Sequence, residues 1–106
     1  MTYDEFDTLL QKMQSEELAV REAGQKEYAQ DFSNVFANFD RVATALPIDR
    51  KQVLMVYALK HLDGINAYLK GHRSQREDVR GRIKDLRMYL ALLWGMIEEE
   101  EEEVSN

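Results

Sequence analysis

Residues 52–70 read QVLMVYALKHLDGINAYLK. Apolar residues recur in it every three or four positions, which is the spacing of one face of an α-helix. They are Leu54, Ala58, Leu62, Ile65 and Leu69. A second stretch repeats this spacing, at Val79, Ile83, Leu86, Leu90, Leu93 and Ile97. The sequence therefore predicts two amphipathic helices.

The connection between these two stretches carries signals for a helix end and a helix start. Gly71 is a natural C-terminal stop, and Ser74-Gln75-Arg76-Glu77 is a capping box for the next helix. Because so short a connection makes neighbouring helices pack antiparallel, we expect a helical hairpin. Its helices should span residues of about 50–70 and 75–98.

The rest of the chain also has helical patterns. Thr2-Tyr3-Asp4-Glu5 is a capping box for a long helix over residues of about 3–28. A shorter helix follows before Pro47, and Asp49 is in place to cap the first helix of the hairpin. No stretch alternates apolar and polar residues as a β-strand does. The expected fold is an all-α helical bundle.

Length and charge suggest one domain with an acidic end. A chain of 106 residues supports a single helical domain, which we expect over residues 1–98. Residues 99–106 are expected to form an acidic C-terminal tail, since the six glutamates Glu98–Glu103 oppose the dipole of the preceding helix. Without these glutamates the chain has 14 acidic and 14 basic residues, and a neutral body gives little support to nucleic acid as a partner, which we do not expect.

Two further classes of protein do not fit the sequence. With no cysteine, the chain has neither a disulfide framework nor a thiolate metal site. No stretch is apolar and uncharged over eighteen residues, and the first residues lack the pattern of a signal peptide. We therefore expect a cytoplasmic protein that has no membrane partner.

Several ionisable residues share the apolar faces of the hairpin. His61 lies on the line of Leu54 and Ile65, with Lys60 and Asp63 beside it. On the second helix Arg82 and Asp85 share a line with Tyr89, Leu92 and Met96. One interpretation is ion pairing at the edge of the core, for example of Lys60 or Arg82 with Asp85. The other is a small-molecule or metal site between the helices, where helical bundles usually place one.

A set of short motifs over residues of about 24–98 resembles a known group of proteins. The motifs are Glu27-Tyr28, Phe36-Ala37-Asn38-Phe39, Val42-Ala43, Tyr57, Lys60-His61, Glu77, Gly81, Arg82, Asp85 and Tyr89-Leu90. In them the chain is similar to the MazG-like all-α nucleoside triphosphate pyrophosphohydrolases and to phage nucleotide-modification-associated domains.

The resemblance implies a dimeric bundle that binds a nucleotide or another small anionic ligand. In active members, carboxylates from two helices hold Mg²⁺ while water attacks between the α- and β-phosphates. Carried over by position, the metal ligands would be Asp63, Glu77 and Asp85. The residues available to the ligand would be Lys60, His61, Arg82 and Tyr89.

The chain departs from the active group in its acidic motifs. That group pairs Glu-x-x-Glu on one helix with Glu-x-x-Asp on the next. Here Arg82 stands three residues before Asp85, so a cation replaces an expected metal ligand. Whether the chain is a magnesium-dependent pyrophosphohydrolase or a nucleotide-binding protein without catalysis is open at this point.

The second helix of the hairpin supports a different function. Residues 91–97, ALLWGMI, are apolar on every side, and a helix of this kind is normally buried on every side. Three other helices in a short chain can hardly cover it completely, so a second copy of the chain is the expected cover. The other interpretation is a monomer that exposes Trp94 at a helix end. The alternative function is therefore a non-catalytic, homo-oligomeric interaction protein that binds itself or a host protein through this helix.

Overall fold

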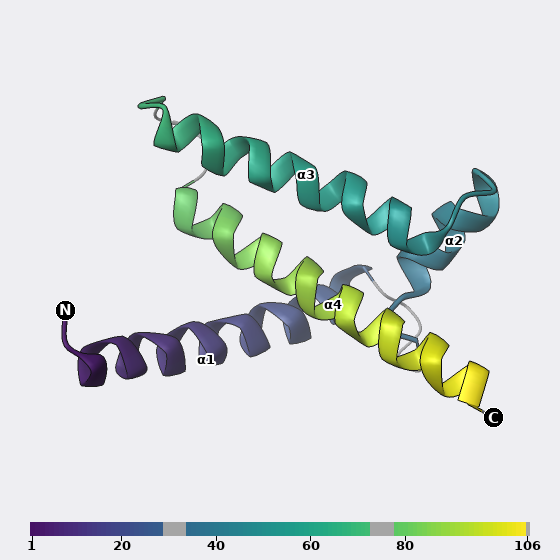
Figure 1. The fold of residues 1–106 in the computed structure, drawn as a ribbon, viewed down its shortest axis with the longest axis horizontal. Helices are drawn as coiled ribbons and strands as arrows, with labels where there is room; N and C mark the ends of the chain where they lie inside the picture. The colour runs from purple at the N-terminus through teal and green to yellow at the C-terminus, as the bar shows by residue number, and fades with distance from the viewer. Residues whose placement is uncertain (29–33, 73–77, 106) are drawn as a thin grey trace. The chain divides into compact units, whose positions relative to one another are not determined.

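A computed structural model describes residues 1–28, 34–72 and 78–105, and over these residues its regular elements are all helices (Figure 1). The helices are α1 (Tyr3–Tyr28), α2 (Ala37–Ala45), α3 (Arg50–Leu69) and α4 (Val79–Ser105). The predicted all-α class is confirmed. Contacts divide the chain into two compact units, Met1–Val35 and Phe36–Asn106. The expected single domain over residues 1–98 stays a prediction.

The first unit contains α1, which has the bounds expected from its sequence pattern. The backbone N–H of Glu5 donates to Thr2 Oγ1 at 3.1 Å, which is half of the predicted capping box. Lys12 and Glu16, one turn apart, form an ion pair of 4.0 Å on its surface.

The second unit is built on the predicted hairpin of α3 and α4, whose mutual packing is the most extensive between any described helices. The two helices run in opposite directions (Figure 1). Arg50 at the start of α3 is paired with Glu99 near the end of α4, while His61 farther along α3 lies beside Asp85. The antiparallel hairpin is confirmed.

Both ends of α3 follow the signals in the sequence. Asp49 accepts a hydrogen bond from the backbone N–H of Lys51 at 2.7 Å, and Gln52 Oε1 accepts one from the N–H of Asp49, so the capping box is complete. After the helix, Gly71 has a φ of +94°. The N–H of His72 then donates to the carbonyl of Ala67 in the pattern of a Schellman motif, which requires such a left-handed residue.

Helix α4 differs from the expectation at its C-terminal end. Asp78 caps its first turn by accepting from the N–H of Arg80 at 2.7 Å, and the expected capping box, Ser74–Glu77, lies outside the described residues. The helix continues through the glutamates to Ser105, seven residues beyond the predicted end. It does so because Arg50 and Lys51 of α3 neutralise the carboxylates that would otherwise oppose the helix dipole.

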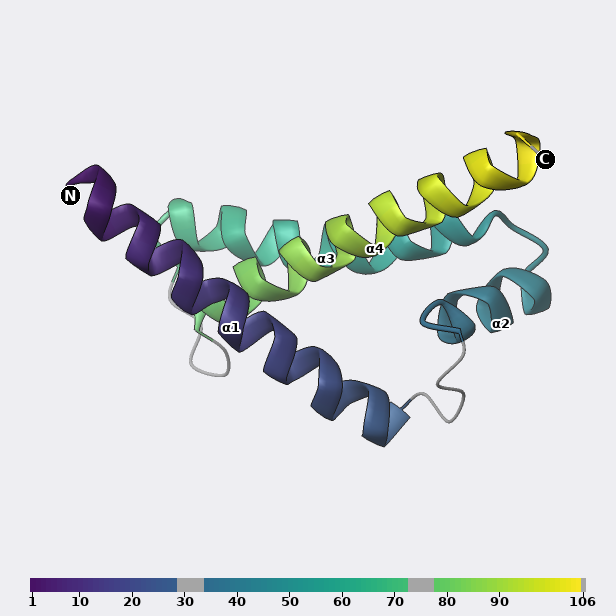
Figure 2. The same cartoon turned by 90° about the horizontal axis from the view of Figure 1, so that it is seen from below.

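Helix α2 covers one side of the hairpin, at the end where α3 begins (Figures 1 and 2). Phe36, which precedes α2, is in the core cluster with Val53 of α3, and a β-carbon at Gly95 of α4 would be 3.0 Å from Phe36 Cζ. Val53 and Gly95 each come immediately before a completely buried residue, Leu54 and Met96. Neighbouring residues are about 100° apart around a helix. On both α3 and α4, the residue immediately before the completely buried one therefore lies on the side that α2 covers.

The opposite side of the hairpin has half-exposed apolar residues. Met55, which follows Leu54, is 38% exposed, and Ile97, which follows Met96, is 41% exposed. Because α3 and α4 are antiparallel, the same rotation about each axis turns both residues towards this side. We term the apolar residues here the open face. They are Met55, Leu59, Leu62 and Leu69 of α3, and Ile83, Leu90, Trp94 and Ile97 of α4.

The open face includes part of the apolar line from Val79 to Ile97 on α4. Three members of this line, Ile83, Leu90 and Ile97, are at least one-third exposed. The α4 residues in or against the core are Tyr89, Leu92, Leu93 and Met96, so of these only Leu93 belongs to the line from Val79 to Ile97. Helix α4 has two apolar lines, and the contact of Phe36 with Gly95 fixes which of them faces α3.

Candidate functional site

Three of the residues expected at a ligand site lie together inside the hairpin. His61 of α3 and Asp85 of α4 form a pair in which Nδ1 and Oδ2 are 3.6 Å apart. The His61 side chain is 13% exposed and Nδ1 is fully buried, whereas Asp85 is 44% exposed. The distance is longer than a hydrogen bond, so Nδ1 has no hydrogen-bond partner.

Tyr89 packs between this pair and the aromatic core. Its ring is 5.6 Å from that of His61 and stacks on Tyr57 with 6.2 Å between centroids and 15° between planes. Phe39 of α2 meets both tyrosines edge-on, in the geometry that aromatic rings prefer. Burial raises the pKa of Tyr89, and the negative charge of Asp85 and the neighbouring Tyr57 raise it further.

Arg82 contacts α3 one turn beyond His61. Its Cδ and Nε atoms lie where a β-carbon would stand on Gly64, so the stem of Arg82 occupies the space left by the missing side chain. The glycine therefore lets a long basic side chain cross the α3–α4 interface. Sequence analysis had proposed Lys60 or Arg82 as the partner of Asp85, and the structure provides His61 for this carboxylate.

The remaining predicted residues do not join this group. Lys60 and Asp63 are exposed. Asp63 is nine residues after the buried Leu54, which is two and a half helical turns, so it lies on the side of α3 that is turned away from α4. Glu77 lies outside the described residues.

A magnesium site is not assembled by the described residues. In residues 1–28, 34–72 and 78–105, no group of three histidine, aspartate or glutamate side chains is placed to hold a metal ion. Magnesium needs several oxygen ligands around one point. Asp85 is close to His61, whereas Asp63 is on a different side of α3. Since Glu77 lies outside the described residues, the magnesium site stays a prediction.

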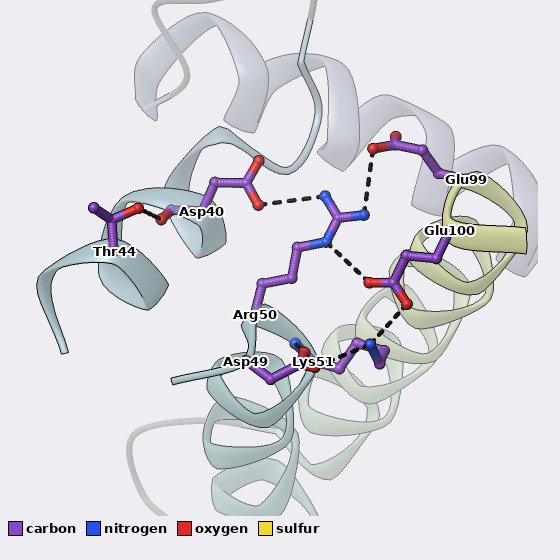
Figure 3. A network of polar contacts seen from close by, with 7 residues as sticks. All are labelled: Asp40, Thr44, Asp49, Arg50, Lys51, Glu99 and Glu100. Carbon is purple, nitrogen blue, oxygen red and sulfur yellow. Dashed lines mark hydrogen bonds and ion pairs between the residues drawn. The ribbon is translucent and has the colours of Figure 1, made fainter. Parts of the chain in front are cut away.

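A second charged cluster, which sequence analysis missed, joins all three helices of the second unit (Figure 3). Arg50, 14% exposed, contacts Asp40 of α2 at 3.3 Å, and Glu99 and Glu100 of α4 at 3.3 and 3.6 Å. Its guanidinium carbon lies 4.9 Å from the centre of the Phe36 ring. Antiparallel helices bring residues near 50 beside residues near 100, so the opposite charges at these two positions were a usable signal.

The pKa values of this cluster follow from its contacts. Burial alone would lower the pKa of Arg50, but hydrogen bonding and charge from Asp40, with a smaller part from Glu99, raise it overall. The hydrogen bond to Glu100, 2.7 Å long, raises the pKa of Lys51. The backbone N–H of Lys51 lowers the pKa of Asp49. The charged side chains of this cluster pair with one another, so we assign the cluster a structural role.

The open face has a shallow groove along α4. The groove has a volume of about 330 Å³ and is lined by Leu90, Leu93, Trp94, Ile97, Glu98 and Glu101. Trp94 is 70% exposed, and its indole Nε1 donates to Glu98 Oε1 at 3.1 Å. A large aromatic side chain is thus held in one orientation on the surface, with apolar neighbours on both sides along the helix.

The described helices contain no segment long and apolar enough to cross a bilayer. Comparisons of the chain with protein-family models, with curated proteins and with solved structures found no match. The resemblance to the MazG-like group therefore stays a prediction.

Proposed function

We propose that this chain is a non-catalytic helical protein that acts by assembly, with the open face as its binding surface. The observation that carries the proposal is the exposure of apolar residues from two helices on one side of the hairpin. Trp94, Leu90 and Leu59 are 70%, 49% and 49% exposed. Exposed apolar side chains of this size are costly in water, and surfaces that carry several of them are typical of protein–protein contacts.

The arrangement of the second unit supports assembly over a buried catalytic site. Its most buried residues form an apolar core, and none of the described buried residues is polar or charged. The charged cluster around Arg50 joins α2, α3 and α4, and none of the residues in its printed ion pairs belongs to the open face. We therefore propose the open face, and not the cluster, as the surface that receives a partner.

Sedimentation velocity over a wide range of protein concentration tests the proposal. The wild-type chain should sediment above the mass of the monomer, and Trp94→Glu and Leu59→Glu should each shift it towards the monomer. Leu46→Glu is the matched control, because Leu46 is 59% exposed but follows α2, outside the open face. A wild-type protein that remains monomeric at every concentration would overturn the proposal.

A second candidate function is binding of a nucleotide or similar anion at the hairpin. It is supported by the gathering of His61, Asp85 and Tyr89 from two helices, with Arg82 one turn away. Thermal unfolding with nucleotides, each with and without Mg²⁺, tests it, since a ligand at a hundred times its Kd stabilises the folded state by about 2.7 kcal/mol. Asp85→Asn should remove a ligand-dependent shift and leave the fold intact. No shift with any nucleotide would exclude this candidate.

A further inference from the structure

We infer that the open face binds a second copy of this chain with the two α4 helices antiparallel, about a two-fold axis near Leu92. This inference rests on the proposed assembly function and specifies its partner and register. Its basis is the order of apolar and charged residues along one line of α4.

This line, which we term the α4 stripe, has the repeat of a coiled coil. Its residues are Arg80, Ile83, Arg87, Leu90, Trp94, Ile97 and Glu101. Their six intervals alternate strictly between three and four residues, so the residues of the stripe stay on one side of the helix. Helices with this spacing pack against each other along the stripe, with side chains of one helix between those of the other.

Charge is distributed unequally along α4. Its first eleven residues, 79–89, contain four basic residues and one acidic residue. Its last part contains the six glutamates and no basic residue. The stripe follows this division, since Arg80 and Arg87 belong to its first half and Glu101 to its second.

The charges select the antiparallel arrangement. In a parallel pair each stripe residue faces its own copy, so Arg87 would meet Arg87 and Glu101 would meet Glu101. In an antiparallel pair centred near Leu92, Leu90 lies opposite Trp94 of the second copy. Glu101 then falls between Arg80 and Arg87 of the second copy. Opposite charges flank an apolar centre in this arrangement, whereas like charges in the other arrangement disfavour pairing.

The apolar centre also has the two most exposed apolar side chains of the stripe. Leu90 and Trp94 are 49% and 70% exposed, and the groove beside them is about 330 Å³ in volume. Two-fold pairing would place the Leu90 side chain of each copy against the Trp94 region of the other, twice by symmetry. An aromatic side chain at the centre of an interface is a common energetic anchor.

Charge reversal tests the register. In sedimentation velocity at low salt, Arg87→Glu alone should weaken self-association by about tenfold, because it places a carboxylate beside Glu101 of the other copy. Glu101→Arg alone should weaken it to a similar extent. An equimolar mixture of the two variants should associate more strongly than either variant alone, because both contacts between positions 87 and 101 of the mixed dimer then pair opposite charges.

Arg41→Glu is the control for net charge, since Arg41 is exposed on α2 and away from the stripe. Circular dichroism should show the same helical content for all variants. If the wild type assembles but neither single reversal weakens it, or if the mixture does not restore assembly, the antiparallel register is wrong and the proposed function stands. If the wild type does not assemble, both fail.

Discussion

The stem of Arg82 crosses helix α3 at Gly64, in the space that any larger residue would fill with its β-carbon. The two residues come from opposite helices of the hairpin, 18 positions apart in the chain. A helix-weakening glycine in the middle of α3 is thus explained by a side chain of α4.

A double-mutant cycle on this pair should show strong coupling. In an Arg82→Ala background, Gly64→Ala should stabilise the fold by about 1 kcal/mol, because alanine is the better helix former and the obstruction is gone. In the wild-type background the same change should gain less, since Arg82 must move first. Denaturant unfolding of the four proteins measures the cycle. Equal effects of Gly64→Ala in both backgrounds would contradict the contact.

Two neighbouring residues of α3 should separate folding from assembly. Leu54 is completely buried, so Leu54→Ala should destabilise the fold by about 2–5 kcal/mol through a cavity in the core. Met55 is 38% exposed on the open face, so Met55→Ala should leave the unfolding midpoint of the monomer nearly unchanged and weaken self-association. Urea unfolding at a concentration where the protein is monomeric, together with sedimentation, measures both effects. Similar losses of stability for the two variants would refute this division.

The cluster around Arg50 should contribute measurably to stability. Arg50→Ala removes contacts with three carboxylates and with the ring of Phe36, and should cost about 1–2 kcal/mol, since the carboxylates are partly exposed and screened by water. Arg50→Lys should recover part of the loss. The control is Arg41→Ala, which should have little effect on the midpoint of denaturant unfolding. A loss no larger than that of the control would mean that the cluster is not stabilising.

The cap of α3 should make stability fall in acid. Folding lowers the pKa of Asp49 because its carboxylate accepts the backbone N–H of Lys51. Its contribution is therefore complete above the ordinary aspartate value and is lost as the pH falls below about 4. Asp49→Asn keeps a capping side chain but cannot ionise. Its thermal midpoint should depend less on pH below about 4 than that of the wild type, and parallel pH curves for the two proteins would contradict the assignment.

The sequence predicts where the helices begin and end better than it predicts which side of each helix is buried. Local capping chemistry determines the ends of α3, so Asp49 and Gly71 could be identified without a structure. The face of α4 that packs on α3 could not be identified, because two apolar lines on this helix satisfy the same period. The choice depends on Phe36, which is distant in sequence from Gly95.

The candidate site, too, could be predicted from the sequence only in part. His61, Asp85 and Tyr89 share helical lines with core residues, so their meeting inside the hairpin could be anticipated. Asp63 is turned away from α4 because the line of Leu54 packs inward. The choice of Asp63 as a metal ligand did not take this orientation into account. The pairing of Arg50 with Glu99 was missed because the glutamates were assigned to a separate tail.

The glutamate run also gives α4 a length that depends on its surroundings. Beyond Ile97 this helix is fastened to α3 mainly through charge, by the contacts of Glu99 and Glu100 with Arg50 and Lys51. Dissolved salt shortens the reach of such attractions to about 10 Å at 0.1 M and less at higher concentration. The final turns should then fray while the buried core stays closed. Helix α4 should therefore become shorter at its C-terminal end as the ionic strength rises, and the part that unwinds includes Glu101.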